Sequence, residues 1–178
     1  VDDNSPCSLP ELPSVQVVGV DKTVGPGAAR NEGLQLVATS LVAFIDLDVS
    51  ITPATIGEML AYFNVQEVGL VAPRVCSKNG SSLLSQYESI RSPLDLGVVE
   101  ARVRAGTRVS YVPSALWLCR TAAIREIDGF DVSLTVGEDV DAVWRLDKAG
   151  WQCRYQPNAM CTHEPRKSLQ QLINQRIA

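Results

Sequence analysis

Two aspartates follow an apolar run in residues 44–48 (FIDLD). Open α/β sheets bind their ligands at the carboxyl ends of the strands, so these acids stand at a place suited to chemistry. If the strand continues through them, Asp46 and Asp48 share one side and Leu47 points into the core. Two carboxylates suit Mg²⁺ or Mn²⁺, which complete their coordination with phosphate oxygens. The alternative is a pair of turn aspartates that cap the next helix.

A second acidic group lies in residues 136–141 (VGEDVD), at the start of a predicted helix. The helix macrodipole favours acids in the first turn, which is a complete structural explanation. The functional alternative makes Asp139 a general base that accepts a proton from an attacking hydroxyl. The residues alone leave both interpretations open.

Polar residues near the start of the chain form a third group. A carboxylate at a strand end, such as Asp2 or Asp3, can accept hydrogen bonds from a base or a ribose. The small residues 25–29 precede a helix and allow the backbone to approach a phosphate, to which Arg30 can add a charged fork. The alternative is an ordinary loop and terminus. His163, the single histidine, either completes the metal site or is merely exposed or structurally bonded.

The elements that must position these residues alternate between strands and helices, which predicts an α/β sandwich with a mostly parallel sheet. Thr52 followed by Pro53 predicts a capped helix start, and residues 83–106 form an irregular excursion. We expect strands at 15–20, 41–47, 68–75, 109–112, 116–119 and 152–156, and helices at 28–38, 53–63, 120–127, 138–148 and 167–177.

Size and composition fit one ordinary globular domain. The chain has 178 residues and a formal net charge of −4, which gives no electrostatic case for nucleic-acid binding. Its apolar runs are too short to cross a bilayer. Five scattered cysteines without a CxxC pair exclude a zinc knuckle, and free thiols predict a reducing, cytoplasmic setting, either in solution or peripheral to the membrane. We expect Cys119 and Cys153 to be small buried hydrophobes.

Taken in order, these segments resemble the family 2 glycosyltransferases of the GT-A fold. The resemblance rests on residues 1–5, 27–33, 44–48, 129–131 with 137–139, and His163. It implies a doubly wound sheet between helices that lacks the family's first strand and helix, within one catalytic domain fragment, 1–178. Residues 1–75 would form its nucleotide and metal half, and 76–178 its acceptor half. Because residues 1–5 read as the end of a strand, we expect an open sheet edge and a homodimer.

The resemblance also implies an inverting transfer of a sugar from a nucleotide diphosphate donor to an acceptor hydroxyl, with Mg²⁺ or Mn²⁺. Residues 87–97, 109–115 and 136–146 are similar to the mycofactocin-biosynthesis branch, which implies UDP-glucose as donor and a peptide-derived redox cofactor as acceptor. The implied roles are nucleotide contacts for Asp2, Asp3, Arg30 and Asp46, metal contacts for Asp46, Asp48 and His163, and the general base for Asp139.

Two other functional classes remain possible for this sequence. Residues 44–50 also resemble the nucleophile motif of haloacid-dehalogenase-type phosphatases, in which Asp46 would attack phosphorus and Asp48 would act as acid and base. Against this, Val49 and Ser50 stand where those enzymes usually have glycine and threonine. A non-catalytic fragment is the third interpretation, and it predicts that no nucleotide binds.

Overall fold

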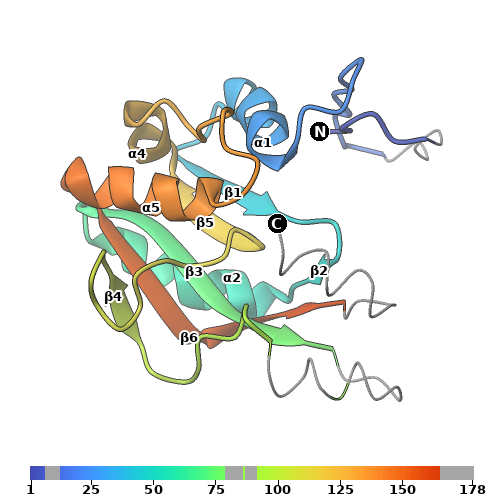
Figure 1. Cartoon of the computed structure of the whole chain (residues 1–178). Coiled ribbons are helices and arrows are strands. Elements are labelled where there is room, and N and C mark those ends of the chain that lie inside the picture. Colours follow the sequence, from blue (N-terminus) through green and yellow to red (C-terminus); the bar gives the residue numbers. More distant parts are fainter. Residues whose placement is uncertain (7–12, 79–85, 87–91, 165–178) are drawn as a thin grey trace.

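The computed structural model describes residues 1–6, 13–78, 86 and 92–164. Its centre is a six-stranded sheet in which five strands follow the order β1-β5-β3-β6-β2, and β4 pairs with residues 153–155 of β6, outside this linear order (Figure 1). The strands are β1 (Leu41–Ile45), β2 (Val49–Ser50), β3 (Val68–Ser77), β4 (Ala101–Val103), β5 (Leu116–Arg120) and β6 (Gln152–His163).

The expected α/β sandwich is confirmed, but the sheet is mixed rather than mostly parallel. Among the described strands only β3 and β6 pair in parallel, whereas β5 runs antiparallel to both β1 and β3. The first four residues of β5 are all buried because helices cover both faces of the sheet. A continuous apolar run is typical of parallel strands for the same reason, so the pattern could not reveal the direction of β5.

Helices cover the two faces of the sheet unequally. The helices α1 (Pro26–Gln35), α4 (Thr121–Glu126) and α5 (Glu138–Lys148) lie on one face, and α2 (Pro53–Leu60) with the 3-10 turn η1 (Ala61–Asn64) lies on the other (Figure 1). Each face has its own apolar cluster; the larger contains Leu34, Ile124 and Leu146, and the smaller is centred on Met59. The buried, free thiols of Cys119 and Cys153 belong to the larger cluster, as expected.

Local signals in the sequence placed several elements correctly. Thr52 and Thr55 form a reciprocal capping box at the start of α2, where Pro53 occupies the first turn. The predicted helix at 138–148 is confirmed at both ends. The predicted strand at 152–156 is confirmed and is longer, because β6 continues along β3 to His163.

Other expectations were wrong. Residues 15–20 form no strand but only an isolated bridge between Gly19 and Asp2, and Val15 and Val17 are exposed because no neighbouring strand covers them. Residues 109–112 form no strand either, since Val109 and Val112 are apolar for packing in the core. The short strand β4 lies within the supposed irregular excursion and was missed. The expected tail helix at 167–177 lies outside the described residues.

Candidate active site

The chain turns immediately after β1, and this turn separates the two aspartates. The backbone N–H of Asp46 still donates to Ala115, 3.0 Å away, but the N–H of Val49 then donates back to the Asp46 carbonyl at 3.1 Å. The expectation that Leu47 points into the core is therefore wrong: its side chain is fully exposed at the tip of the turn. Asp46 and Asp48 consequently have different partners.

Asp48 lies against His163. The ladder between β2 and β6 pairs Val49 with His163, and the N–H of Glu164 donates to the Asp48 carbonyl at 3.0 Å. This register places His163 Nε2 3.0 Å from Asp48 Oδ2. The structure therefore joins two of the three predicted metal-binding residues, from segments far apart in the sequence.

The donor set around this pair fits a divalent ion that has few protein ligands. The carboxylate suits Mn²⁺ or Mg²⁺ when diphosphate oxygens complete the shell, and the imidazole favours Mn²⁺, the softer of the two ions. Across the described ranges, no three His, Cys, Asp or Glu side chains cluster closely enough to hold an ion alone. Asp46 is turned toward α1, so the full set of Asp46, Asp48 and His163 stays a prediction.

Arg30 is the partner of Asp46. Its guanidinium donates to Asp46 Oδ1 at 2.8 Å and to Glu138 Oε1 at 3.0 Å, and it lies 5.3 Å from the centre of the Phe130 ring. Burial raises the pKa of Asp46 above its usual value, although the hydrogen bond and charge of Arg30 act in the opposite direction. One side chain thus connects the end of β1 with the start of α5.

Asp3 orders the entry to α1. Its carboxylate accepts hydrogen bonds from the backbone N–H groups of Val24, at 2.7 Å, and Gly25, at 3.0 Å. Gly25 has a φ of 87°, a left-handed conformation that glycine adopts without strain, and the helix begins at the next residue. The first turn of α1, and Arg30 with it, is therefore placed partly by Asp3.

A cleft of about 470 Å³ brings Asp3, Arg30 and Asp46 together between α1 and β1. Three of the four predicted nucleotide-binding residues line this one cleft. Asp2 is not among its lining residues: the hydroxyl of Ser5 and, to a smaller extent, the Ser5 N–H, which donates to its carboxylate at 3.0 Å, lower the pKa of Asp2.

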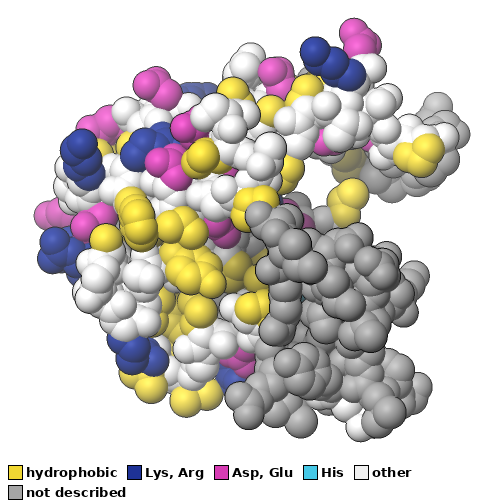
Figure 2. Space-filling view, viewed as in Figure 1, with side chains coloured by type: hydrophobic (Ala, Val, Ile, Leu, Met, Phe, Trp, Pro, Cys, Tyr) yellow, Lys and Arg dark blue, Asp and Glu magenta, His cyan; other side chains and the backbone are white. Residues whose placement is uncertain are grey.

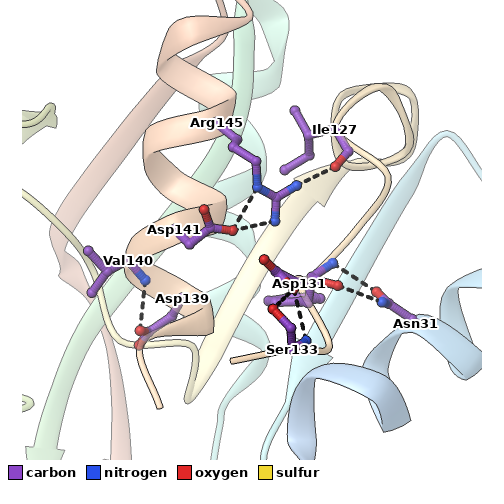
Figure 3. A network of polar contacts seen from close by, with 9 residues as sticks. Asn31, Ile127, Asp131, Ser133, Asp139, Val140, Asp141 and Arg145 are labelled. Atoms are coloured by element: carbon purple, nitrogen blue, oxygen red, sulfur yellow. Dashed lines mark hydrogen bonds and ion pairs between the residues drawn. The ribbon is translucent and has the colours of Figure 1, made fainter. Parts of the chain in front are cut away.

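Asp139 lies in the first turn of α5, whose N-cap is Gly137 with a φ of 85°. Its Oδ1 accepts a hydrogen bond from the N–H of Val140 at 2.8 Å (Figure 3). Burial raises the pKa of Asp139, and the negative charge of Glu138 adds to this, whereas backbone hydrogen bonds and Arg30 oppose it. A carboxylate with a raised pKa holds a transferred proton better, which suits a general base.

Asn31 fixes the loop that precedes α5. Its side chain donates to the carbonyl of Phe130 at 2.8 Å and accepts from the N–H of the same residue at 2.9 Å (Figure 3). This double contact needs Gly129, because a Cβ there would lie only 2.3 Å from Asn31 Oδ1. Asn31 therefore ties α1 to the loop on the acceptor side.

Sequence reasoning gave no role to either Asn31 or Glu138. Both lie in segments that it singled out, directly beside Arg30 and Asp139 respectively. Glu138 is buried, and an acid in an acidic first turn is normally exposed, so its contact with Arg30 could not be foreseen. The only signals for these contacts in the sequence are Gly137 before the predicted helix start and, far upstream, the adjacent pair Arg30 and Asn31.

The family profile described as "Glycosyltransferase like family 2" matches residues 10–178. The chain belongs to this family. A pre-mycofactocin glycosyltransferase of Mycobacterium tuberculosis (strain H37Rv) is 41% identical over 97% of this chain, which confirms the resemblance to that branch. A poly-beta-1,6-N-acetyl-D-glucosamine synthase of Staphylococcus aureus (strain COL) is 22% identical over 90% of the chain. The chain spans 38% and 39% of the length of these relatives.

Solved structures share the fold. GalNAc-T7 with UDP, GalNAc and Mn²⁺ has a TM-score of 0.62 and 14% identity, and the match covers 84% of this chain and 32% of that one. The mannosyltransferase PcManGT from Pyrobaculum calidifontis, with GDP-Man and Mn²⁺, has the same score and identity and covers 90% and 43%. The fold is GT-A, as expected, and the family assignment displaces the phosphatase interpretation of Asp46. No helix in the described part of the chain is long and apolar enough to span a membrane.

Proposed function

We propose that this protein is an inverting glycosyltransferase that moves a sugar from a nucleotide diphosphate donor to an acceptor hydroxyl with the aid of a divalent metal. The observation that carries the proposal is the shared cleft of Asp3, Arg30 and Asp46, connected through Arg30 to the turn that bears Asp139. Donor-side and acceptor-side groups therefore converge at one end of the sheet.

The donor would occupy the cleft between α1 and β1. Asp3 keeps acceptor capacity beyond its two backbone hydrogen bonds and would accept from the nucleoside. Arg30 would lie near the base or the diphosphate. We propose UDP-glucose or a similar donor, in keeping with the 41% identical relative and the nucleotide complexes of the structural neighbours.

Asp48 and His163, with Asp46 as the third predicted ligand, would hold Mg²⁺ or Mn²⁺. Bound there, the ion neutralises charge that develops on the diphosphate leaving group. Both structural neighbours contain Mn²⁺, which supports the choice of metal. The contact between Asp48 and His163 keeps the two donor atoms on the same side of the β2–β6 pair.

Asp139 would take the proton of the acceptor. The hydroxyl oxygen forms a bond to the anomeric carbon while the bond from that carbon to the diphosphate breaks, and the nucleoside diphosphate leaves. A single displacement of this kind inverts the anomeric centre. A retaining glycosidase would need two carboxyl groups about 5–5.5 Å apart on either side of the bond.

The acceptor we propose is a peptide-derived redox cofactor, in line with the name of the 41% identical relative. Hydrophobic side chains form a band on the face that carries α5 (Figure 2). Val136, three residues before Asp139, and Trp144 of α5 are exposed apolar side chains. An exposed apolar surface beside the proposed base suits an acceptor with an apolar portion.

The proposal is tested first by binding and then by transfer. Melting temperatures are measured with UDP, UDP-glucose, GDP and GDP-mannose, each with and without Mn²⁺, followed by detection of donor-dependent glycosylation. We expect stabilisation by a uridine nucleotide that is larger with Mn²⁺. No stabilisation by any nucleotide would support the non-catalytic alternative. The homodimer stays a prediction, which light scattering tests.

A further inference from the structure

Among the described residues, Arg30 is the one side chain that forms ion pairs both with the donor cleft, at Asp46, and with the first turn of α5, at Glu138. Arg30 comes from α1 and donates to the carboxylates of Asp46 and Glu138 through two different nitrogens, Nη2 and Nη1. Asp46 belongs to the donor cleft, and Glu138 precedes Asp139 in the same helical turn. A planar guanidinium has donors in a rigid fork, so it fixes both partners at once.

Burial makes this bridge stiff. The side chains of Arg30 and Glu138 are only 12% and 11% exposed, so the charge of Glu138 depends on Arg30 for compensation, and the charge of Arg30 depends on Glu138 and Asp46 together. The ring of Phe130, over which Arg30 lies, packs edge-on against Phe44 and is stacked on Trp117. Arg30 cannot move far without disturbing this aromatic group, and Glu138 is bonded to Arg30.

The start of α5 lies close to α1. Gly27 is buried, and a Cβ there would meet the side chains of Phe130 at 3.4 Å and Glu138 at 3.5 Å. The start of α5 therefore contacts α1 near Gly27 and at Arg30. Because Asp139 follows Glu138 in the first turn, whatever places Glu138 also places Asp139.

We propose that Arg30 and Glu138 act as a positioning bridge, which sets the Asp139 carboxylate relative to Asp46 and so aligns acceptor and donor; this inference rests on the proposed transferase function. Neither residue of the bridge needs to touch the acceptor. Small misplacement of a reacting group costs large factors in rate, so the bridge should act on the chemical step.

The kinetic test uses the intact protein with UDP-glucose and Mn²⁺. In Glu138→Ala we expect kcat to fall about tenfold or more, with the donor KM within about twofold. Glu138→Gln keeps an oxygen that accepts from Arg30 and should recover most of the lost kcat. The matched control is Asp147→Ala, at the other end of α5, which removes the ion pairs with the exposed side chains of Arg102 and Arg104. It should lower the melting temperature and leave kcat unchanged.

Two kinetic results would overturn the bridge. One is an equal kcat in Glu138→Ala and Asp147→Ala. The other is a raised donor KM with an unchanged kcat in Glu138→Ala, because that pattern belongs to donor binding. Failure of Glu138→Gln to restore activity would also count against positioning by this contact.

A second measurement needs no activity, so it separates failure of the bridge from failure of the proposed function. Melting temperatures are compared for Asp46→Ala, Glu138→Ala and the double variant, with Arg30 present and again with Arg30→Met. With Arg30 present, the double variant should lose more than the sum of the single losses, because the buried guanidinium is left uncompensated. With Arg30→Met this excess should vanish. Additive losses in both backgrounds would refute the bridge, even in a protein that transfers no sugar.

Discussion

Asp139→Asn separates a catalytic base from a helix-stabilising acid. The amide has the shape of the carboxyl group, and its oxygen can still accept from the N–H of Val140, but it cannot take up the acceptor's proton. General-base contributions are typically about 10²–10⁴-fold. This corresponds to about 3–5.5 kcal/mol of activation free energy, at about 1.4 kcal/mol for each factor of ten. We expect kcat to fall by that factor while affinity for UDP stays constant.

Asp139→Asn should change stability in the opposite direction from the loss of an acid that only stabilises a helix terminus. Loss of an acid that only stabilises a helix terminus costs about 0.3–1 kcal/mol. The raised pKa of Asp139 shows instead that burial outweighs the favourable contacts of its charge. The folded protein therefore binds this proton more tightly than the unfolded chain does. The resulting stabilisation is present below the ordinary aspartate pKa and is lost as the pH rises through the raised value.

At neutral pH the charged Asp139 therefore destabilises the folded state, and the Asp139→Asn variant should melt at an equal or higher temperature. Activity of the unmodified protein should fall as the pH falls through the raised pKa, because the base becomes protonated. Turnover, UDP affinity and melting temperature are measured on the same preparations. Near-normal turnover together with a lowered melting temperature would show that Asp139 is only a structural acid.

Three further substitutions test other parts of the site and fold. Asp48→Ala removes the partner of His163, and we expect Mn²⁺ to stop strengthening UDP binding in calorimetry; a persisting Mn²⁺ effect would contradict the metal assignment. Gly129→Ala forces a side chain into left-handed backbone and against Asn31, and should destabilise the protein by about 2 kcal/mol or more in denaturant unfolding. An unchanged midpoint would show that the loop can relax. Thr52→Ala removes the capping box of α2 and should cost about 1 kcal/mol without altering transfer, so a loss of activity would be unexpected.

Local chemistry made part of the fold predictable. Thr52 and Pro53 mark the start of α2, because a threonine cap and a proline in the first turn are both determined by nearby residues. The apolar run that begins at Leu41 becomes β1, although the strand ends one residue before Asp46. The side-chain alternation expected for Asp46 and Asp48 failed for this reason: a two-residue period holds only while the backbone stays extended.

Contacts between distant segments could not be derived from local patterns. Arg30 was expected to face the donor, but its two carboxylate partners come from the end of β1 and the start of α5. His163 meets Asp48 because β6 continues well beyond residue 156, the end expected for this strand. The first outcome depends on how α1 and α5 pack and the second on sheet register, and the order of motifs along a chain specifies neither. The site residues were identified by type and position, while their pairing was not.

The place of β5 in the sheet has a consequence for how the chain folds. β5 lies between β1 and β3, and its register joins Leu41 to Arg120 and Leu70 to Cys119. Within the described part of the chain, β1 and β3 therefore lack this shared neighbour until β5 has been synthesised. Closing such long loops costs chain entropy before any contact is gained, which slows folding. During that interval the edges of β1 and β3 are open to other chains, so a newly made chain should depend on chaperones until residue 120 has emerged.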